Sequence, residues 1–253
     1  MSIVNEIARL QSDSAAIAQA IEAKGVTVPS GSGYDDYASL IGQISTGGGG
    51  GGSDEPHTLP STYTRLLYIE NPLGNSAYIN TGVPGSMRPL YTIDFMSYDD
   101  FNSTTYGCIL GSRQSSNAND WQLTTYCTSG EGTLRLGASA YNYNAHLPAK
   151  NTRFTASLTS TSYIVDSTTY TVSRAASIGV SYNIYVFALN QATNTVQNGH
   201  GKLYSLKMHY GNHLIRDFVP CKNPSNVVGM YDLINETFYG SANSSVFSAG
   251  PAV

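Results

Sequence analysis

The chain has 253 residues, of which 12% are charged, and its formal net charge is −4 at pH 7. The charged share is about half of the usual ~25%, and no run of lysines or arginines is present, which argues against nucleic acid binding through phosphate neutralisation. No apolar run approaches the ~20 residues that a membrane span needs. Tyr, Ser, Thr, Asn and Gly are abundant instead, a composition that suits β-structure and neutral ligands.

A helix is the first element that the sequence predicts. Apolar residues recur at alternating spacings of four and three, interrupted only by Ser14, which forms a heptad seam. The seam consists of Ile3, Ile7, Leu10, Ile17 and Ile21. Gly25 is expected to end this helix. A second short helix is predicted after it, with an inner face formed by Tyr37, Leu40, Ile41 and Ile44.

The two helices have two interpretations, a hairpin within one chain or an oligomer. About 45 residues in two helices rarely bury enough apolar surface to be stable alone, and isoleucine at both seam positions favours three strands over two. We therefore expect residues 1–46 to form a homotrimer. Glu6, Arg9 and Asp13 interrupt the apolar stretch that a signal peptide needs, so export by that route is not expected.

A glycine-rich segment separates this module from the rest. Six consecutive glycines, Gly47 to Gly52, are followed by Ser53-Asp54-Glu55-Pro56. A phosphate-binding loop would need a Lys and a Ser or Thr at its end and a helix after it. Because acidic residues and a proline follow instead, we interpret residues 47–60 as a flexible linker. The second domain then spans residues 61–253.

From Tyr63 onward, short stretches with period-two alternation are separated by polar turns, and no long helical period occurs. This spacing predicts a mostly β domain, an antiparallel sandwich of two packed sheets. The predicted strands before residue 200 span 65–70, 77–81, 90–98, 107–111, 121–127, 134–139, 153–159, 163–165, 170–173 and 183–189.

Two hairpins in succession are predicted near the C-terminus. The first covers residues 203–219 with a turn at Gly211-Asn212, and the second covers residues 227–239. Pro220 and Pro224 are expected to interrupt the sheet between them, because proline cannot donate a ladder hydrogen bond.

Residues in these hairpins and in the opening strands resemble a known family. The strings are Ile215-Arg216-Asp217-Phe218-Val219-Pro220-Cys221-Lys222-Asn223-Pro224, Val228-Gly229-Met230-Tyr231-Asp232, Tyr68-Ile69-Glu70 and Tyr78-Ile79-Asn80-Thr81-Gly82. They are similar to bacteriophage virion proteins with a concanavalin A-like, laminin-G-like jelly-roll domain, although Asn80 stands where an Asp is common. Residues 21–29 (IEAKGVTVP) resemble the small helical module that opens many phage tail and fibre proteins.

The resemblance implies a jelly roll for the second domain and a trimeric fibre, spike or head fibre whose helical module attaches to other virion proteins. It also implies adhesion to host-surface or mucosal carbohydrate without a catalysed reaction. The protein would be made in the bacterial cytoplasm and reside in the virion. Two alternatives stay open: a purely structural capsid or tail decoration protein, and a glycan depolymerase.

Metal-binding patterns are weak. His209 and His213 are spaced like an HxxxH pair, but that spacing brings two ligands together only on a helix. If 209 pairs with 214 across the predicted hairpin, the two histidines point to opposite faces. No cofactor is predicted, and calcium is left open at Asp99-Asp100 and at 117–120, where loop oxygens suffice without a motif.

Catalytic patterns are also absent, so no enzyme is expected. A glycosidase needs two carboxylates about 5–10 Å apart, whereas the acids here are scattered and no Gly-x-Ser-x-Gly elbow occurs. Glu70, Asp217 and Asp232 are interpreted as structural carboxylates that accept hydrogen bonds from turn and strand-end amides. The three cysteines are interpreted as buried reduced thiols; they are Cys108, Cys127 and Cys221.

Carbohydrate binding remains, because sugars are held by aromatic faces together with amide, carboxylate and backbone groups. Two segments combine these groups, 117–121 and 141–146, and the single Trp beside an Asp is a candidate stacking platform. The alternative places the Trp in the core and leaves an exposed Tyr-rich loop. The candidate ligand-binding residues are Asn119, Asp120, Trp121, Tyr141, Asn142, Tyr143 and His146.

Overall fold

The computed structural model describes residues 3–22, 26–29, 32–33, 36–37, 57–100, 107–114, 120–125, 132–137, 139–191 and 194–253. The chain divides into two compact units, residues 1–56 and residues 57–253, and we call the second the β unit. Within the described ranges, no helix is long and apolar enough to cross a membrane.

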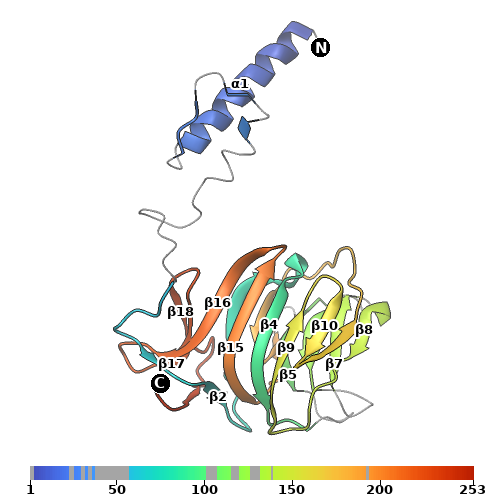
Figure 1. Ribbon diagram of the computed structural model, residues 1–253, viewed down its shortest axis with the longest axis vertical. Helices are drawn as coiled ribbons and strands as arrows, with labels where there is room; N and C mark the ends of the chain where they lie inside the picture. The colour runs from blue at the N-terminus through green and yellow to red at the C-terminus, as the bar shows by residue number, and fades with distance from the viewer. Residues whose placement is uncertain are drawn as a thin grey trace. The chain divides into compact units, whose positions relative to one another are not determined.

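The N-terminal unit begins with the predicted helix, α1 (Ile3–Glu22; Figure 1). Near its C-terminal end, Ile21 is only 2% exposed. This side chain packs inside its own chain against a small cluster formed by Ile17, Ala18, Val26, Val28 and Tyr37. The Tyr37 hydroxyl donates a hydrogen bond to the Ser14 carbonyl at 3.0 Å. The expectation that Ile21 contacts other chains is therefore wrong, because its surface is already covered.

Leu10, in the N-terminal part of the seam, differs from Ile21 in exposure. Leu10 is 42% exposed, as a residue that packs against a second chain would be in a single copy. The side chains of Ile3 and Ile7 lie outside the described residues, and so do three predicted inward positions of the second helix, namely Leu40, Ile41 and Ile44. Trimer formation stays a prediction.

The β unit is an antiparallel sandwich of two sheets, which confirms the predicted fold class (Figure 1). Among the described residues the larger sheet has eleven strands, in the order β11-β10-β9-β4-β15-β16-β17-β18 with three further strands at its margins. Its strands are β1 (Thr64–Arg65), β2 (Ile69–Asn71), β4 (Leu90–Ser97), β9 (Arg153–Leu158), β10 (Ser162–Val165), β11 (Thr168–Thr171), β15 (Gly201–Tyr210), β16 (His213–Lys222), β17 (Val228–Asp232), β18 (Thr237–Tyr239) and β19 (Ser248–Ala249).

The smaller sheet has eight strands in the same described ranges, with the main order β14-β13-β5-β6-β7-β8 and with β12 joining β5 to β3. Its strands are β3 (Ile79–Pro84), β5 (Cys108–Arg113), β6 (Asp120–Thr124), β7 (Thr133–Gly137), β8 (Asn142–Asn144), β12 (Asn183–Val186), β13 (Leu189–Gln191) and β14 (Asn194–Val196). Two 3-10 turns, η1 (Gly85–Met87) and η2 (Ser139–Tyr141), precede β4 and β8. β8 is the last strand in the order given above and is therefore an edge strand.

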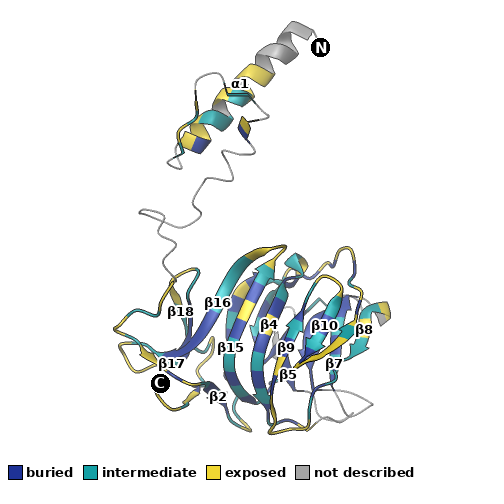
Figure 2. Cartoon of the chain, in the orientation of Figure 1, coloured by how far each residue is buried: buried dark blue, intermediate teal, exposed yellow. Residues whose placement is uncertain are grey.

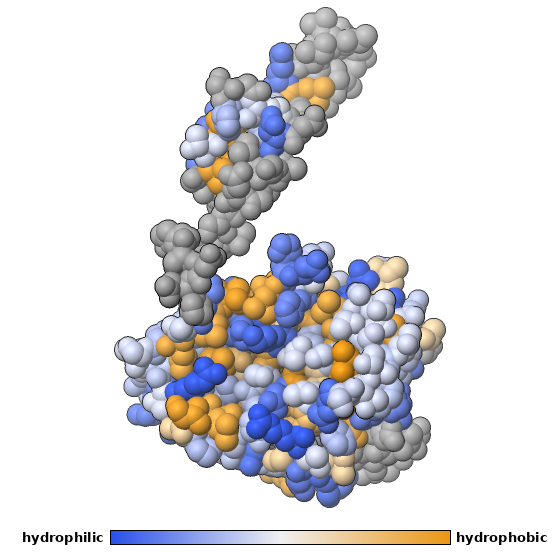
Figure 3. Space-filling view, in the orientation of Figure 1, coloured by the Kyte–Doolittle hydropathy of each residue, from blue (hydrophilic) through white to orange (hydrophobic). Residues whose placement is uncertain are grey.

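The core lies between the two sheets. Burial alternates along β4 and most of β15, as one face of each strand turns inward (Figure 2). Large inward side chains of the two sheets include Ile93, Phe95, Leu206, Trp121 and Leu123, all at most 1% exposed. Outside the core, Figure 3 shows strongly hydrophilic groups mixed with apolar ones on the side of the β unit in view.

The C-terminal hairpins form as predicted, with one correction at Pro220. This residue lies inside β16, opposite Met230 of β17, and does not interrupt the sheet. Its carbonyl accepts a hydrogen bond from Leu66 N at 2.9 Å, on the side away from β17. The missing N–H faces that same side, where pairing of β16 with β15 ends at Phe218 and only the two-residue strand β1 pairs with Cys221 and Lys222, so the proline does not interrupt pairing with β17. Pro224 lies in the turn between the strands, as expected.

Two cysteines match their predicted state. Cys108 and Cys221 are free thiols, and both side chains are buried. Burial raises the pKa of Cys221 to about 12 and that of Cys108 further still, so neither is a reactive thiolate. Cys127 lies outside the described residues.

Candidate functional site

Asp120, one of the predicted ligand residues, is the centre of a buried ionic cluster. It begins β6, where it shares one face with Gln122 while Trp121 and Leu123 point into the core. Its Oδ2 accepts hydrogen bonds from Arg135 Nη1 at 2.9 Å and from Gln122 Nε2 at 3.2 Å. Its Oδ1 lies 3.5 Å from Arg113 Nε. Two guanidinium groups thus surround one carboxylate that is itself 3% exposed.

This cluster holds Arg135 in place with part of its hydrogen-bonding capacity unused. Among the described residues, Arg135 Nε and Gln122 Oε1 are buried atoms without a hydrogen-bond partner. Buried polar groups in native proteins are usually paired, so each such atom calls for an explanation. The Arg135 side chain is 21% exposed, and its cross-strand neighbour on β8 is the exposed Asn142. The cluster therefore orients the guanidinium of Arg135 on β7, the strand next to the edge strand β8.

The segment from Tyr141 to His146 is more ordered than the predicted loop. Tyr141 ends η2 and packs against the core, and Asn142 to Asn144 form β8. Tyr143 faces the core side, where its hydroxyl accepts a hydrogen bond from Ser173 N at 2.9 Å and lies 3.2 Å from Ser173 O. The loop interpretation is therefore corrected to an edge strand.

His146 leaves this strand in a strained conformation. Its φ of 50° lies in the left-handed region, and its N–H donates to Asn144 Oδ1 at 3.0 Å. The imidazole stacks on Tyr170 with ring centroids 3.7 Å apart and planes inclined by 4°. The two rings form a flat aromatic pair near the same edge.

Trp121 is not part of this surface. Its side chain is 1% exposed and lies in the core between the sheets, so the prediction of a stacking platform is wrong. Asp120, the described polar neighbour of Trp121 in that segment, lies on the other face of β6. Asn119 lies outside the described residues. Of the predicted residues, Asp120 and Asn142 come together through β7, whereas Tyr143 and Trp121 serve packing.

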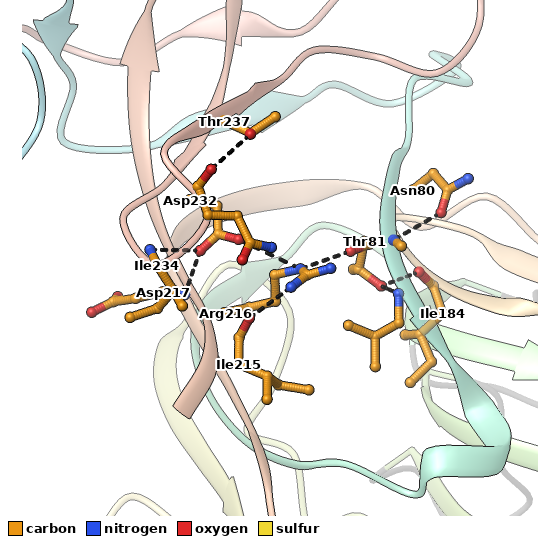
Figure 4. Close-up of polar contacts among 12 residues, drawn as sticks. Asn80, Thr81, Ile184, Ile215, Arg216, Asp217, Asp232, Ile234 and Thr237 are labelled. Atoms are coloured by element: carbon orange, nitrogen blue, oxygen red, sulfur yellow. Dashed lines mark hydrogen bonds and ion pairs between the residues drawn. The ribbon is translucent and has the colours of Figure 1, made fainter. Parts of the chain in front are cut away.

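Three of the four strings that carry the family resemblance meet at a second polar cluster, shown in Figure 4; they are the strings that contain Thr81, Arg216 and Asp232. Arg216 of β16 donates from Nε to the Thr81 carbonyl of β3 at 3.0 Å, which ties the larger sheet to the smaller one. The same Nε lies 3.5 Å from Asp232 Oδ2. Asp232 Oδ1 in turn accepts from Asp217 N at 2.9 Å and Ile234 N at 3.1 Å, which confirms its structural role.

The other two acids of these strings use their side chains elsewhere. Asp217 forms an ion pair with Lys207 at 3.0 Å, and Glu70 accepts a hydrogen bond from the Tyr98 hydroxyl at 2.8 Å. Neither is bound to turn amides as predicted. All three acids nevertheless have protein partners.

Comparison with known proteins adds no identification: no family model matches the chain, and no curated protein or solved structure matches it. The function proposed below therefore rests on the side chains themselves and on the resemblance described under Sequence analysis.

The candidate metal ligands are also engaged by protein groups. The hairpin register pairs His209 with Leu214 and Tyr210 with His213, so the two histidines point to opposite faces as predicted. Of the calcium candidates, Asp120 faces two arginines and Asp100 pairs with Lys150. Among the described residues, no group of three or more His, Cys, Asp or Glu side chains is placed to hold a metal ion.

Asp99, the remaining calcium candidate, forms a half-buried pair with His200 that resembles the base and orienting acid of a catalytic triad. Asp99 Oδ1 lies 2.7 Å from His200 Nδ1, and Asp99 Oδ2 accepts from His200 N at 2.8 Å. His200 Nε2, however, lies 3.2 Å from the Asn75 carbonyl, an acceptor and not a nucleophile. Both ring nitrogens thus face acceptors, an arrangement that favours the protonated imidazolium. The same contacts tie His200 to Asp99 and Asn75, which are distant from it in the sequence.

This pair predicts a pH dependence of stability. The hydrogen bond with Asp99 raises the pKa of His200 above its ordinary 6.5, against an opposing effect of burial. The stabilisation is therefore complete below the unfolded pKa near 6.5 and is lost as pH rises through the folded pKa. We expect His200→Gln to lower the free energy of unfolding more at pH 5.5 than at pH 8.5, measured by urea titration. His213→Gln, at the exposed start of β16, is the control. An equal loss for His200→Gln at both pH values would contradict this role.

Proposed function

We propose that this chain is a bacteriophage virion structural protein whose β-sandwich binds carbohydrate on the host surface or in mucus, without catalysing a reaction. Support comes from the resemblance of residues 215–232 and 68–82 to such proteins and from the antiparallel sandwich itself. The binding surface is the edge of the smaller sheet, which we call the β8 edge and define by Arg135, Tyr141, Asn142, His146 and Tyr170.

The observation that carries the proposal is the placement of Arg135. The buried Asp120 of β6 holds its guanidinium, and the cross-strand neighbour of Arg135 on the other side is the exposed Asn142 of β8, the last strand of the sheet. Sugar hydroxyls are bound by such fixed donors and acceptors, and the apolar faces of sugar rings lie against aromatic rings like the His146–Tyr170 pair. Because the donors lie on strands and not on a long loop, little order has to be gained on binding.

Assembly would raise the strength of adhesion. In the proposal α1 joins three chains through the part of the seam that includes the exposed Leu10, and the N-terminal unit attaches to other virion proteins. Several copies of a weak site can add 10²–10⁴-fold in avidity when their spacing fits the target. Light scattering of the full chain is expected to give the mass of three copies, and a monomer would contradict the trimer.

Glycan-array binding of the full chain tests the adhesion proposal. We expect binding to at least one class of bacterial-surface or mucosal saccharide, with no release of reducing sugar from the bound polysaccharide. Failure to bind any saccharide would favour the purely structural decoration role. Release of reducing ends would favour the depolymerase role instead.

A further inference from the structure

Two arginines near the β8 edge differ from most others in the β unit. Arg113, Arg135, Arg153 and Arg216 each form an ion pair with an aspartate. Within the part of the chain that the structure describes, Arg88 and Arg174 pair with no carboxylate, although both are half-buried. Buried charges are normally paired, so two half-buried arginines without a carboxylate partner are a candidate site for an anion.

Arg88 is held rigidly at the end of η1. Its φ of 48° lies in the left-handed region, and its N–H donates to the Gly85 carbonyl at 2.8 Å. The turn itself is pinned, because Gly85 N and Ser86 N donate to the carbonyls of Tyr182 and Val180. From this frame the guanidinium Nη1 donates to the Ala175 carbonyl at 2.6 Å. Among the described residues, only this one of its five donors has a hydrogen-bond partner.

Arg174 is held from both sides of its own backbone. The preceding residue, Ser173, is bonded through its N–H to the Tyr143 hydroxyl. The following residue, Ala175, donates to the Leu136 carbonyl at 3.1 Å. The Arg174 Nη1 donates to the carbonyl of Arg88 at 3.2 Å, so each arginine side chain reaches the loop that carries the other.

This arrangement brings two positive charges together. Each side chain reaches the backbone beside the other, so the two like charges are expected to repel, and burial together with the charge of Arg88 lowers the pKa of Arg174. The two hydrogen bonds to carbonyls fix the loops but leave that repulsion in place. An anion bound by both guanidinium groups would remove it and would use donors that are otherwise unpaired.

The pair lies beside the proposed saccharide surface. Along β7, Arg135 pairs with Asn142 of β8, and the next residue, Leu136, accepts the hydrogen bond from Ala175. The segment that carries Arg174 therefore continues the line of β8 alongside β7. A saccharide on the β8 edge would have the two arginines within its immediate neighbourhood.

We propose that Arg88 and Arg174 bind the carboxylate or sulfate group of an acidic saccharide, so that the adhesin recognises negatively charged glycans. This inference rests on the proposed function and specifies its ligand. It differs from the expectation of a neutral sugar, which followed from the low overall charge, because it is based on a local pair of cations and not on the net charge.

The test measures affinities of the full chain for oligogalacturonate, dextran sulfate and uncharged dextran by isothermal titration calorimetry. We expect one of the acidic probes to bind the parent at least about 10-fold more tightly than dextran does. We expect the affinity of that probe for Arg88→Gln and for Arg174→Gln to be lower than for the parent by about 10-fold or more. Arg65→Gln, a matched change at an exposed arginine, should bind like the parent. Whether oligogalacturonate or dextran sulfate binds better identifies the group as carboxylate or sulfate.

A second variant allows the test to be made if the glutamine variants fail to fold. Arg174→Lys keeps the charge and one donor but loses the planar fork, so it should fold and bind with intermediate affinity. If dextran and the acidic probes bind equally and the arginine variants match the parent, the inference is wrong while carbohydrate adhesion stands. If no saccharide binds at all, both the inference and the proposed function are wrong.

Discussion

Asp232→Ala is expected to lower the free energy of unfolding of the β unit by about 3–5 kcal/mol. The carboxylate is 0% exposed, accepts two backbone N–H bonds and lies 3.5 Å from Arg216 Nε. Removing it leaves a largely buried guanidinium without its counter-charge and two amides without their acceptor. Because Arg216 also bonds to Thr81 of the other sheet, the loss weakens the link between the sheets.

Urea titration of the full chain, followed by far-ultraviolet circular dichroism, measures this change. Asp217→Ala is the matched control, because its ion pair with the exposed Lys207 is a surface pair worth about 0–1 kcal/mol. Asp232→Asn keeps one acceptor oxygen and should lie between the two. Equal losses for Asp232→Ala and Asp217→Ala would show that the buried pair is not a determinant of stability.

Trp121→Ala is expected to cost about 3–5 kcal/mol of unfolding free energy, as typical for removal of a large buried aromatic side chain. Trp121 is 1% exposed and lies among the core residues between the sheets. Since it is the only Trp in the chain, its fluorescence in the parent should be blue-shifted and protected from acrylamide. A variant that unfolds like the parent, or a parent whose Trp is quenched freely, would contradict the core position.

The alternation of apolar and polar residues was sufficient to predict most strands of the larger sheet. Strands such as β4, β9 and β15 alternate because one face is buried and the other is solvated, which is the condition under which period two is visible in a sequence. In β6 the pattern misled. Asp120, which was predicted to lie in a binding loop, is buried with Gln122 and Thr124 on the face opposite Trp121 and Leu123, so it begins a strand that is buried on both faces.

Features set by distant residues were beyond sequence reasoning. Arg88 and Arg174 come together across the fold, as do Asp99 and His200, and no spacing in the sequence connects either pair. Pro220 was misjudged because its missing N–H faces away from β17, on the side where β15 no longer pairs and only the short strand β1 lies. The heptad seam predicted the helix, but whether Ile21 packs on Tyr37 or on another chain depends on the loop that folds back.

Binding of the full chain to its array-selected saccharide, compared between the parent and Asn142→Ala, tests the proposed adhesion surface most directly. Asn142 is exposed on the edge strand opposite Arg135, so its loss removes a ligand contact without opening the core. Asn212→Ala, in the exposed turn between β15 and β16, is the matched control. We predict that Asn142→Ala weakens binding by about 5–10-fold while Asn212→Ala matches the parent. Equal affinity of all three proteins would place carbohydrate binding elsewhere and contradict the β8 edge as the site.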